Sequence, residues 1–140
     1  MTINDIQNEI IGEFSGLNDW MDKYAYLIEL GKKLKPLDVR SKTEENLLKG
    51  CQARVWIKAE LKDNRVCFAA DSEALITKGL IALLMRVLNN QAPGDILNAD
   101  LYFIEEIGLS SHLSPSRANG LASIVRQIKW YGKTLKTEKD

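Results

Sequence analysis

The sequence predicts an α+β fold, in which a small antiparallel β-sheet packs against a layer of helices. Residues 53–70 alternate between apolar and polar side chains with a period of two, and the Asp63-Asn64 pair between them favours a tight turn. Apolar residues at helical spacing stand on both sides of this hairpin, and strands and helices do not alternate along the chain. Helices flanking one hairpin are typical of α+β proteins rather than of doubly wound parallel sheets.

Two helices are expected before the hairpin. The first covers residues 20–34, because its apolar side chains recur at helical spacing, Asp19 can act as N-cap and Pro36 follows its end. The second is short: residues 41–44 have the spacing of a capping box, and the helical segment stops at Leu48. Both helices precede the loop that leads into the first strand.

The register of the hairpin follows from its two-residue turn. With Asp63 and Asn64 as the turn, the cross-strand pairs on one face are all apolar. These pairs are Leu61 with Val66, Ala59 with Phe68, and Ile57 with Ala70. The same register places Cys67 opposite Glu60, on the other face, and separates it from Cys51 by roughly 20–30 Å, beyond the ~7 Å limit of a disulfide. We therefore expect neither a disulfide nor a shared metal.

The remaining helices follow the hairpin. The most apolar helix is expected to start at an N-cap formed by Asp71-Ser72 and to end at Asn89, with Gly79 allowing a neighbouring helix to come close. Three elements come after it: a short turn from Pro93 through Leu97, a helix capped by Asp100 and ended by Gly108, and a last helix that starts at Ser114-Pro115 and carries Leu121, Ile124, Val125 and Ile128.

Length and composition indicate a single domain over residues 1–140. The chain is 45% hydrophobic and 27% charged with a formal charge of zero, so its charge gives no reason to expect nucleic acid or a membrane as partner. The N-terminus lacks the pattern of a secretory signal, and the longest apolar run is far shorter than the ~20 residues of a membrane span. We expect a cytoplasmic location, and a frayed tail over residues 133–140.

Cys51 is the first candidate for chemistry. Gly50 frees the backbone for a tight turn, and Lys49 and Arg54 bring positive charge near the sulfur, which favours the reactive thiolate. The alternative is a small buried apolar residue, which is the commoner fate of cysteine. With two cysteines, one histidine and neither a CxxC nor an HExxH motif, the chain offers no zinc site, and no metal is expected.

Arg117 is the second candidate. It falls in the first turn of the last helix, where the helix dipole opposes a cation, and no acidic residue stands within a turn on either side. Together with the free N–H groups of the helix start, it can bind an anion. The alternative is a solvated arginine, or one paired with a distant glutamate. His112, in the preceding loop, is a candidate neighbour of such a site.

Two stretches resemble the signature sequences of the SufE family. They are Gly50-Cys51-Gln52-Ala53-Arg54-Val55-Trp56 and His112-Leu113-Ser114-Pro115-Ser116-Arg117-Ala118-Asn119-Gly120. Further similar segments, at residues 20–32, 71–76 and 78–82, occur in the same order as in the family. The resemblance implies a fold shared with IscU-type scaffold proteins, with the active cysteine on a loop at one end of a small sheet.

The resemblance also implies a function. Cys51 matches the cysteine that accepts persulfide sulfur from a cysteine desulfurase, and the protein would stimulate that enzyme and pass the sulfur on for iron–sulfur cluster assembly. Arg117 matches the arginine of the second signature, and Asp71 matches the acidic residue that closes the hairpin. The other supporting or partner-docking candidates are Gly50, Gln52, Lys49, Arg54 and His112. Ala53 stands where the family often has serine, which puts one loop hydrogen bond in doubt.

The implied protein is an accessory of the sulfurtransferase type with a persulfide intermediate, not an independent metabolic enzyme. Its desulfurase, SufS-like or CsdA-like, uses pyridoxal phosphate, whereas this chain is expected to bind no cofactor. A downstream iron–sulfur scaffold complex would take the sulfur, and the chain would be a monomer or weak homodimer. Two alternatives stay open: an iron–sulfur scaffold-like protein, although a cluster needs about four thiolate-type ligands, and an activator that stimulates the desulfurase by docking alone.

Overall fold

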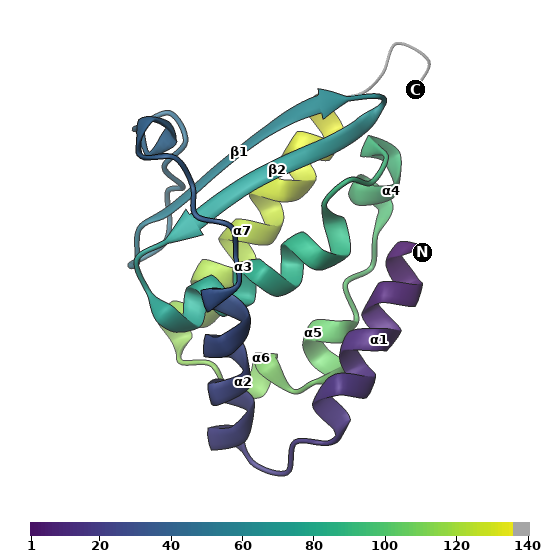
Figure 1. The fold of residues 1–140 in the computed structure, drawn as a ribbon, viewed down its shortest axis with the longest axis vertical. Coiled ribbons are helices and arrows are strands. Elements are labelled where there is room, and N and C mark those ends of the chain that lie inside the picture. Colours follow the sequence, from purple (N-terminus) through teal and green to yellow (C-terminus); the bar gives the residue numbers. More distant parts are fainter. Residues whose placement is uncertain (136–140) are drawn as a thin grey trace.

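The computed structural model describes residues 1–135 as helices around one two-stranded antiparallel sheet, which confirms the α+β prediction (Figure 1). The elements are α1 (Ile3–Ser15), α2 (Trp20–Lys32), the 3-10 turn η1 (Val39–Ser41), β1 (Val55–Lys62), β2 (Arg65–Ser72), α3 (Leu75–Leu88), α4 (Pro93–Asn98), α5 (Phe103–Glu106), α6 (Leu109–His112) and α7 (Pro115–Thr134). The hairpin covers α3 and α7, whereas α1, α2, α5 and α6 form the other end of the molecule (Figure 1).

The tail is helical for longer than predicted. Residues 133 and 134 belong to α7, so the prediction of a frayed tail is wrong for these two. Residues 136–140, which complete the predicted tail, lie outside the described residues.

The hairpin has the predicted register. Asp63 and Asn64 form its turn with φ angles of 53° and 65°, the left-handed conformation that type I′ hairpin turns require. The three predicted pairs are present: Leu61 with Val66, Ala59 with Phe68, and Ile57 with Ala70. Cys67 lies opposite Glu60, as predicted. The apolar face of the hairpin packs on the helices. The Asp63-Asn64 turn lies at the end of the hairpin opposite the Cys51 loop (Figure 1).

The segment before β1 is extended, so the short helix predicted to end at Leu48 is wrong. The Leu48 N–H donates to the carbonyl of Val55 at 2.8 Å, and the Ile57 N–H donates to the carbonyl of Asn46 at 2.9 Å. This pairing occupies the outer edge of β1, whose backbone groups would otherwise lack a partner, whereas an isolated helix of one or two turns is unstable. Residues 49–54 consequently form a loop that is held at both ends.

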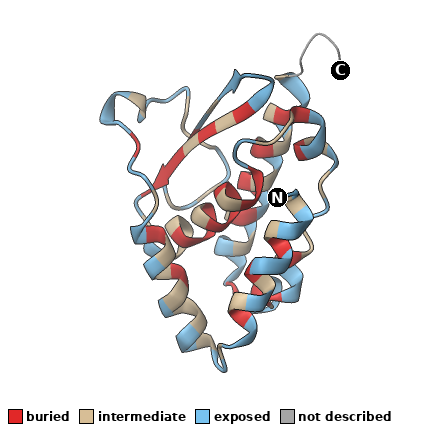
Figure 2. Ribbon diagram, turned by 45° about the vertical axis from the view of Figure 1, so that its right-hand side comes forward, coloured by how far each residue is buried: buried red, intermediate tan, exposed pale blue. Residues whose placement is uncertain are grey.

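α3 is the buried centre of the fold, as its apolar sequence predicts (Figure 2). A Cβ on Gly79 would lie 2.3 Å from the carbonyl oxygen of Leu27 in α2, so only glycine fits at this crossing. The N-cap predicted at Asp71-Ser72 is wrong. Both residues end β2 because strand pairing continues through Ser72, and α3 begins later, at Leu75.

α1 is a helix that the sequence patterns above do not predict. Thr2 and Asp5 form a capping box: the Thr2 hydroxyl accepts from the Asp5 N–H at 3.1 Å, and the Asp5 carboxylate accepts from the Thr2 N–H at 3.0 Å. Arg86 of α3 donates to Glu9 at 2.7 Å and to Glu13 at 2.8 Å. These bonds fix α1 against α3.

The segment after α3 agrees with the sequence in part. α4 starts at Pro93, as predicted. Asp100 is not an N-cap, because α5 starts only at Phe103 and Tyr102 occupies the N-cap position. The backbone carbonyl of Asp100 instead accepts a hydrogen bond from the Gln7 side chain at 3.0 Å. Gly108, with φ of +82°, separates α5 from α6.

The last two helices bring the second signature stretch to the site. His112 ends the short helix α6, so the prediction that it lies in a loop is wrong. α7 begins where predicted, and the hydroxyl of Ser114 accepts from the Arg117 N–H at 3.3 Å as its N-cap.

Candidate active site around Cys51

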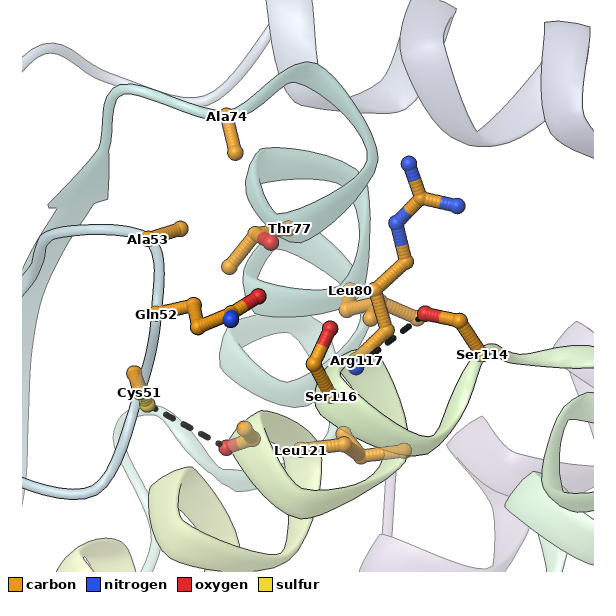
Figure 3. Close-up of a pocket in the computed structure, with 11 residues that line it drawn as sticks. Cys51, Gln52, Ala53, Ala74, Thr77, Leu80, Ser114, Ser116, Arg117 and Leu121 are labelled. Atoms are coloured by element: carbon orange, nitrogen blue, oxygen red, sulfur yellow. Dashed lines mark hydrogen bonds between the residues drawn. The ribbon is translucent and has the colours of Figure 1, made fainter.

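A pocket of ≈ 380 Å³ opens where the loop of residues 49–54 meets the start of α3 and the start of α7 (Figure 3). Its walls are formed by Cys51, Gln52, Ala53, Ala74, Thr77, Leu80, Ser114, Ser116, Arg117, Gly120 and Leu121. Cys51 and Arg117, which the sequence marks as separate candidates, therefore belong to one pocket.

Cys51 is half-buried in the loop wall of this pocket. Gly50 before it has a φ of +91°, and a Cβ there would lie 3.0 Å from the hydroxyl oxygen of Ser123, so both the backbone and the space require glycine. The Cys51 S–H donates to the carbonyl oxygen of Gly120 in α7, with 3.6 Å between the atoms (Figure 3). The thiol is thus held against α7.

Burial raises the pKa of the Cys51 thiol above its ordinary value, and the charge of Arg126 offsets that rise in part. The prediction that Lys49 and Arg54 keep the sulfur as thiolate is therefore wrong for this conformation. Arg54 faces Glu73, with 3.8 Å between Nη1 and Oε1, and Lys49 lines a neighbouring groove. In this state Cys51 is a protected thiol.

Arg117 lies in the first turn of α7, as predicted, and within residues 1–135 no carboxylate forms an ion pair with it. Its guanidinium extends to the side of the pocket away from Cys51, and the Gln52 side chain extends into the pocket from the loop (Figure 3). In the first turn of α7, Pro115 has no N–H and the Arg117 N–H is bonded to Ser114, so the turn adds the Ser116 N–H and the positive end of the helix dipole. The pocket thus combines a thiol with groups that bind an anion.

Residues 8–131 match the model of the SufE family, described as an Fe-S metabolism associated domain. The chain belongs to the SufE family. A curated relative, an uncharacterised SufE-like protein of Rhizobium meliloti (strain 1021), is 38% identical over 127 residues, which cover 87% of this chain and 91% of that protein. The resemblance seen in the two signature stretches is confirmed, and the SufE family connects the chain with iron–sulfur metabolism.

A solved structure shares the fold of this SufE chain. The solution structure of a hypothetical protein from Thermus thermophilus matches with a TM-score of 0.76 and 19% sequence identity, covering 93% of this chain and 95% of the other. At this identity the likeness concerns the fold alone.

Asp71 of the SufE chain lies outside the pocket, in a buried ion cluster. Its side chain accepts from the N–H of Leu37 at 3.3 Å and of Ser72 at 2.8 Å, and Lys42 and Lys78 lie at 3.4 and 3.5 Å. Burial opposes its charge, but the two N–H donors and the two lysines outweigh burial and hold the pKa of the carboxyl below its ordinary value. Asp71 therefore fixes the segment that leads toward the Cys51 loop.

His112 also lies outside the pocket. Its ring stacks on Trp20, with 4.0 Å between the ring centroids, and its carbonyl oxygen accepts from the Tyr24 hydroxyl at 2.8 Å. These contacts join α6 to α2 and give His112 a packing role near the start of α7.

Gly120, Ser123 and Arg126 are site residues that the sequence reasoning missed. They stand three residues apart on α7 and follow one side of the helix: Gly120 accepts from the thiol, Ser123 lies against Gly50, and Arg126 acts on the pKa of Cys51. Their i, i+3 spacing after the second SufE signature indicates that they share one side of α7. The sequence does not show that the Cys51 loop covers this side, so the spacing alone does not assign them to the site.

Within residues 1–135 no group of three or more His, Cys, Asp or Glu side chains is placed to hold a metal ion. Cys51 and Cys67 are both free thiols, and Cys67 lies on the hairpin rather than in the pocket wall. No helix in this part of the SufE chain combines the length and the apolar character needed to cross a bilayer.

Proposed function

We propose that this SufE chain is a sulfur acceptor and relay: Cys51 receives sulfane sulfur from a cysteine desulfurase, and the chain thereby stimulates that enzyme and passes the sulfur on for iron–sulfur cluster assembly. The observation that carries the proposal is the pocket that Cys51 shares with Arg117 and the start of α7. A thiolate and a persulfide are both anions, and a guanidinium beside the positive end of a helix dipole is suited to bind them.

The proposed transfer is an exchange at sulfur. The Cys51 thiolate attacks the terminal sulfur of a persulfide on the desulfurase cysteine, so that a new S–S bond forms at Cys51 while the S–S bond of the donor breaks. The donor cysteine leaves as a thiolate with the electron pair of the broken bond. The transferred sulfur keeps its oxidation state, so no further oxidant or reductant takes part. The C–S bond of the substrate cysteine is broken earlier, by the pyridoxal phosphate of the desulfurase.

The protected state of Cys51 supports a relay that acts only with its partner. A raised pKa leaves little thiolate at neutral pH, which limits reaction with small oxidants in solution. Docking of a SufS-like or CsdA-like desulfurase would release the sulfur from Gly120. Lys49, Gln52 and Arg54 are exposed on the same loop and available to that partner.

Intact-mass measurement tests the proposal. The chain is incubated with a cysteine desulfurase and cysteine, without any downstream scaffold, so that loaded protein accumulates. We expect a gain of one sulfur atom, which peptide mapping assigns to Cys51. The Cys67→Ser variant should gain the same mass and Cys51→Ser should gain none. Sulfur found on Cys67 instead, or on neither cysteine, would refute the proposal.

A further inference from the structure

A second groove, of ≈ 320 Å³, flanks the Cys51 loop beyond the pocket described above. It is lined by Leu48, Lys49, Ser123, Arg126, Gln127 and Trp130. Arg117 and Arg126 are separated by about two and a half helical turns, so they leave opposite sides of α7. One arginine therefore belongs to the pocket and the other to the groove.

Ser123 connects the groove to the active loop. Ser123 is buried, and a Cβ added to Gly50 would lie only 3.0 Å from its hydroxyl oxygen. The same oxygen accepts a hydrogen bond from Arg126 Nη2 at 3.0 Å. The guanidinium is thus held one side chain away from the backbone that carries Cys51. In the described part of the chain no carboxylate forms an ion pair with Arg126, so its charge acts on its surroundings.

Charged groups reach the surroundings of Cys51 from three elements. They are Lys49 and Arg54 on its own loop, Glu73 before α3, and Arg117 and Arg126 on α7. Arg54 and Glu73 face one another, and Arg117 points away from the sulfur (Figure 3). Arg126 is the cation whose charge counteracts the effect of burial on the thiol.

The Gly120 carbonyl, in contrast to Arg126, favours the protonated thiol of Cys51. A carbonyl oxygen only accepts, so it binds Cys51 as long as the sulfur carries its proton and repels the sulfur once that proton is lost. A charged sulfur that leaves Gly120 then requires a donor or a cation nearby.

We infer that Arg126, held by Ser123, is a positioning residue that stabilises the charged sulfur of Cys51 from the groove side of α7. This inference rests on the proposed function, because it concerns the state of Cys51 that accepts sulfur. Arg126 raises the fraction of reactive thiolate without touching the donor persulfide, and Arg117 stays available in the pocket for the incoming anion.

The rate of Cys51 alkylation by iodoacetamide, followed from about pH 6 to pH 10 in a Cys67→Ser background, tests the inference, because only the thiolate reacts. Arg126→Gln should lower the rate at pH 7 by roughly two- to fivefold and move the midpoint to higher pH, as expected for one charge acting on a partly exposed group. Arg126→Lys should keep most of the rate. Lys133→Gln, which removes one charge two turns further along the same side of α7, should leave the profile unchanged.

The limiting rate at high pH separates electrostatics from loop opening. A variant that only exposes Cys51 alkylates faster at every pH, whereas loss of Arg126 moves the midpoint and keeps the plateau. A profile of Arg126→Gln that coincides with that of Lys133→Gln overturns the inference. Thermal unfolding identifies a variant that has lost its fold. If Arg126→Gln does not fold, Ser123→Ala, which frees the Arg126 guanidinium, should move the midpoint of alkylation to higher pH by a smaller amount. The alkylation assay contains no desulfurase, so a negative result there would refute the role of Arg126 without refuting sulfur acceptance by Cys51, which the intact-mass experiment tests separately.

Discussion

The thiol of Cys51 donates to the carbonyl oxygen of Gly120, and this contact depends on the chemical state of the sulfur. A protonated thiol can make it, whereas a thiolate, or a sulfur that carries a second sulfur atom, has no hydrogen to donate. Loading of Cys51 would therefore remove the contact that holds the loop against α7. In this way the state of one atom is linked to the position of the loop.

Cys51→Ser should abolish nearly all stimulation of the desulfurase, because serine cannot accept sulfane sulfur. Stimulation is measured as the rate of sulfide release in the presence of a reductant. The matched Cys67→Ser variant should stimulate like the unchanged chain, since Cys67 lies on the hairpin away from the pocket. Full stimulation by Cys51→Ser would favour an activator that works by docking alone.

The alkylation rate of Cys51 should be low at neutral pH and should rise with pH beyond the range in which an ordinary cysteine is already ionised. The reason is the direction of the shift: burial raises the pKa of Cys51, so the thiolate forms later as pH rises. Each pH unit below that pKa should change the rate about tenfold. The same measurement on the chain unfolded in urea supplies the reference, and an identical profile in both states would contradict the prediction.

Gly50→Ala should release Cys51 from α7. Alanine is strained at a φ of +91°, and its Cβ would lie 3.0 Å from Ser123, so we expect a loss of about 1–2 kcal/mol and faster alkylation of Cys51. Urea unfolding and iodoacetamide labelling measure the two effects. Gly94→Ala is the matched control, because a Cβ there meets nothing within 4 Å. Equal stability and labelling for both variants would contradict the role assigned to Gly50.

Asp71→Asn should destabilise the chain by about 2–3 kcal/mol at pH 7, because it leaves two lysines beside a neutral buried amide. The pKa of Asp71 is lowered in the folded state, so its contribution is present above the unfolded value of about 4 and disappears as pH falls through the folded value. Urea unfolding at pH 7 and near pH 3 measures this. Asp38→Asn removes a carboxyl whose pKa is also lowered, by hydrogen bonds with Arg40, but this pair is exposed and should give a much smaller difference. Equal behaviour of the two variants would refute the anchor role.

Gly79→Ala should lower the unfolding free energy by about 2–4 kcal/mol, because a Cβ at 2.3 Å from the Leu27 carbonyl must push α2 and α3 apart. Gly12→Ala makes the same change at a position in α1 where a Cβ meets nothing, and it should stabilise the helix by about 0.5–1 kcal/mol. Changes of opposite sign in the free energy of chemical unfolding of these two variants would support the close crossing of α2 and α3. A neutral result for Gly79→Ala would argue against it.

The parts of the fold that sequence predicts are those fixed by local chemistry. The Asp63-Asn64 turn and the apolar pairs beside it determine the hairpin register without help from the rest of the chain. Ser114 likewise marks the start of α7, because an N-cap acts within four residues.

The parts that sequence does not predict depend on distant contacts. Residues 46–48 have local helix signals but form backbone bonds with β1, whose free edge arises only when the hairpin folds. In the site, Cys51 and Arg117 were recognised from their residue types and neighbours. The effect of Arg126 could not be, because it depends on which side of α7 the active loop covers.

The backbone bond between Leu48 and Val55 also sets a limit on how far the sulfur can travel. Cys51 is the third residue after Leu48, so while that bond holds, its Cα stays within about 10–11 Å of the Cα of Leu48, even with the loop fully extended. Most of the distance between the Cys51 sulfur and the persulfide of the desulfurase must then be closed by docking of the desulfurase, not by motion of the loop. A donor cysteine recessed much deeper than this range would be out of reach, so the depth of its active site becomes a criterion for which desulfurase this chain can serve.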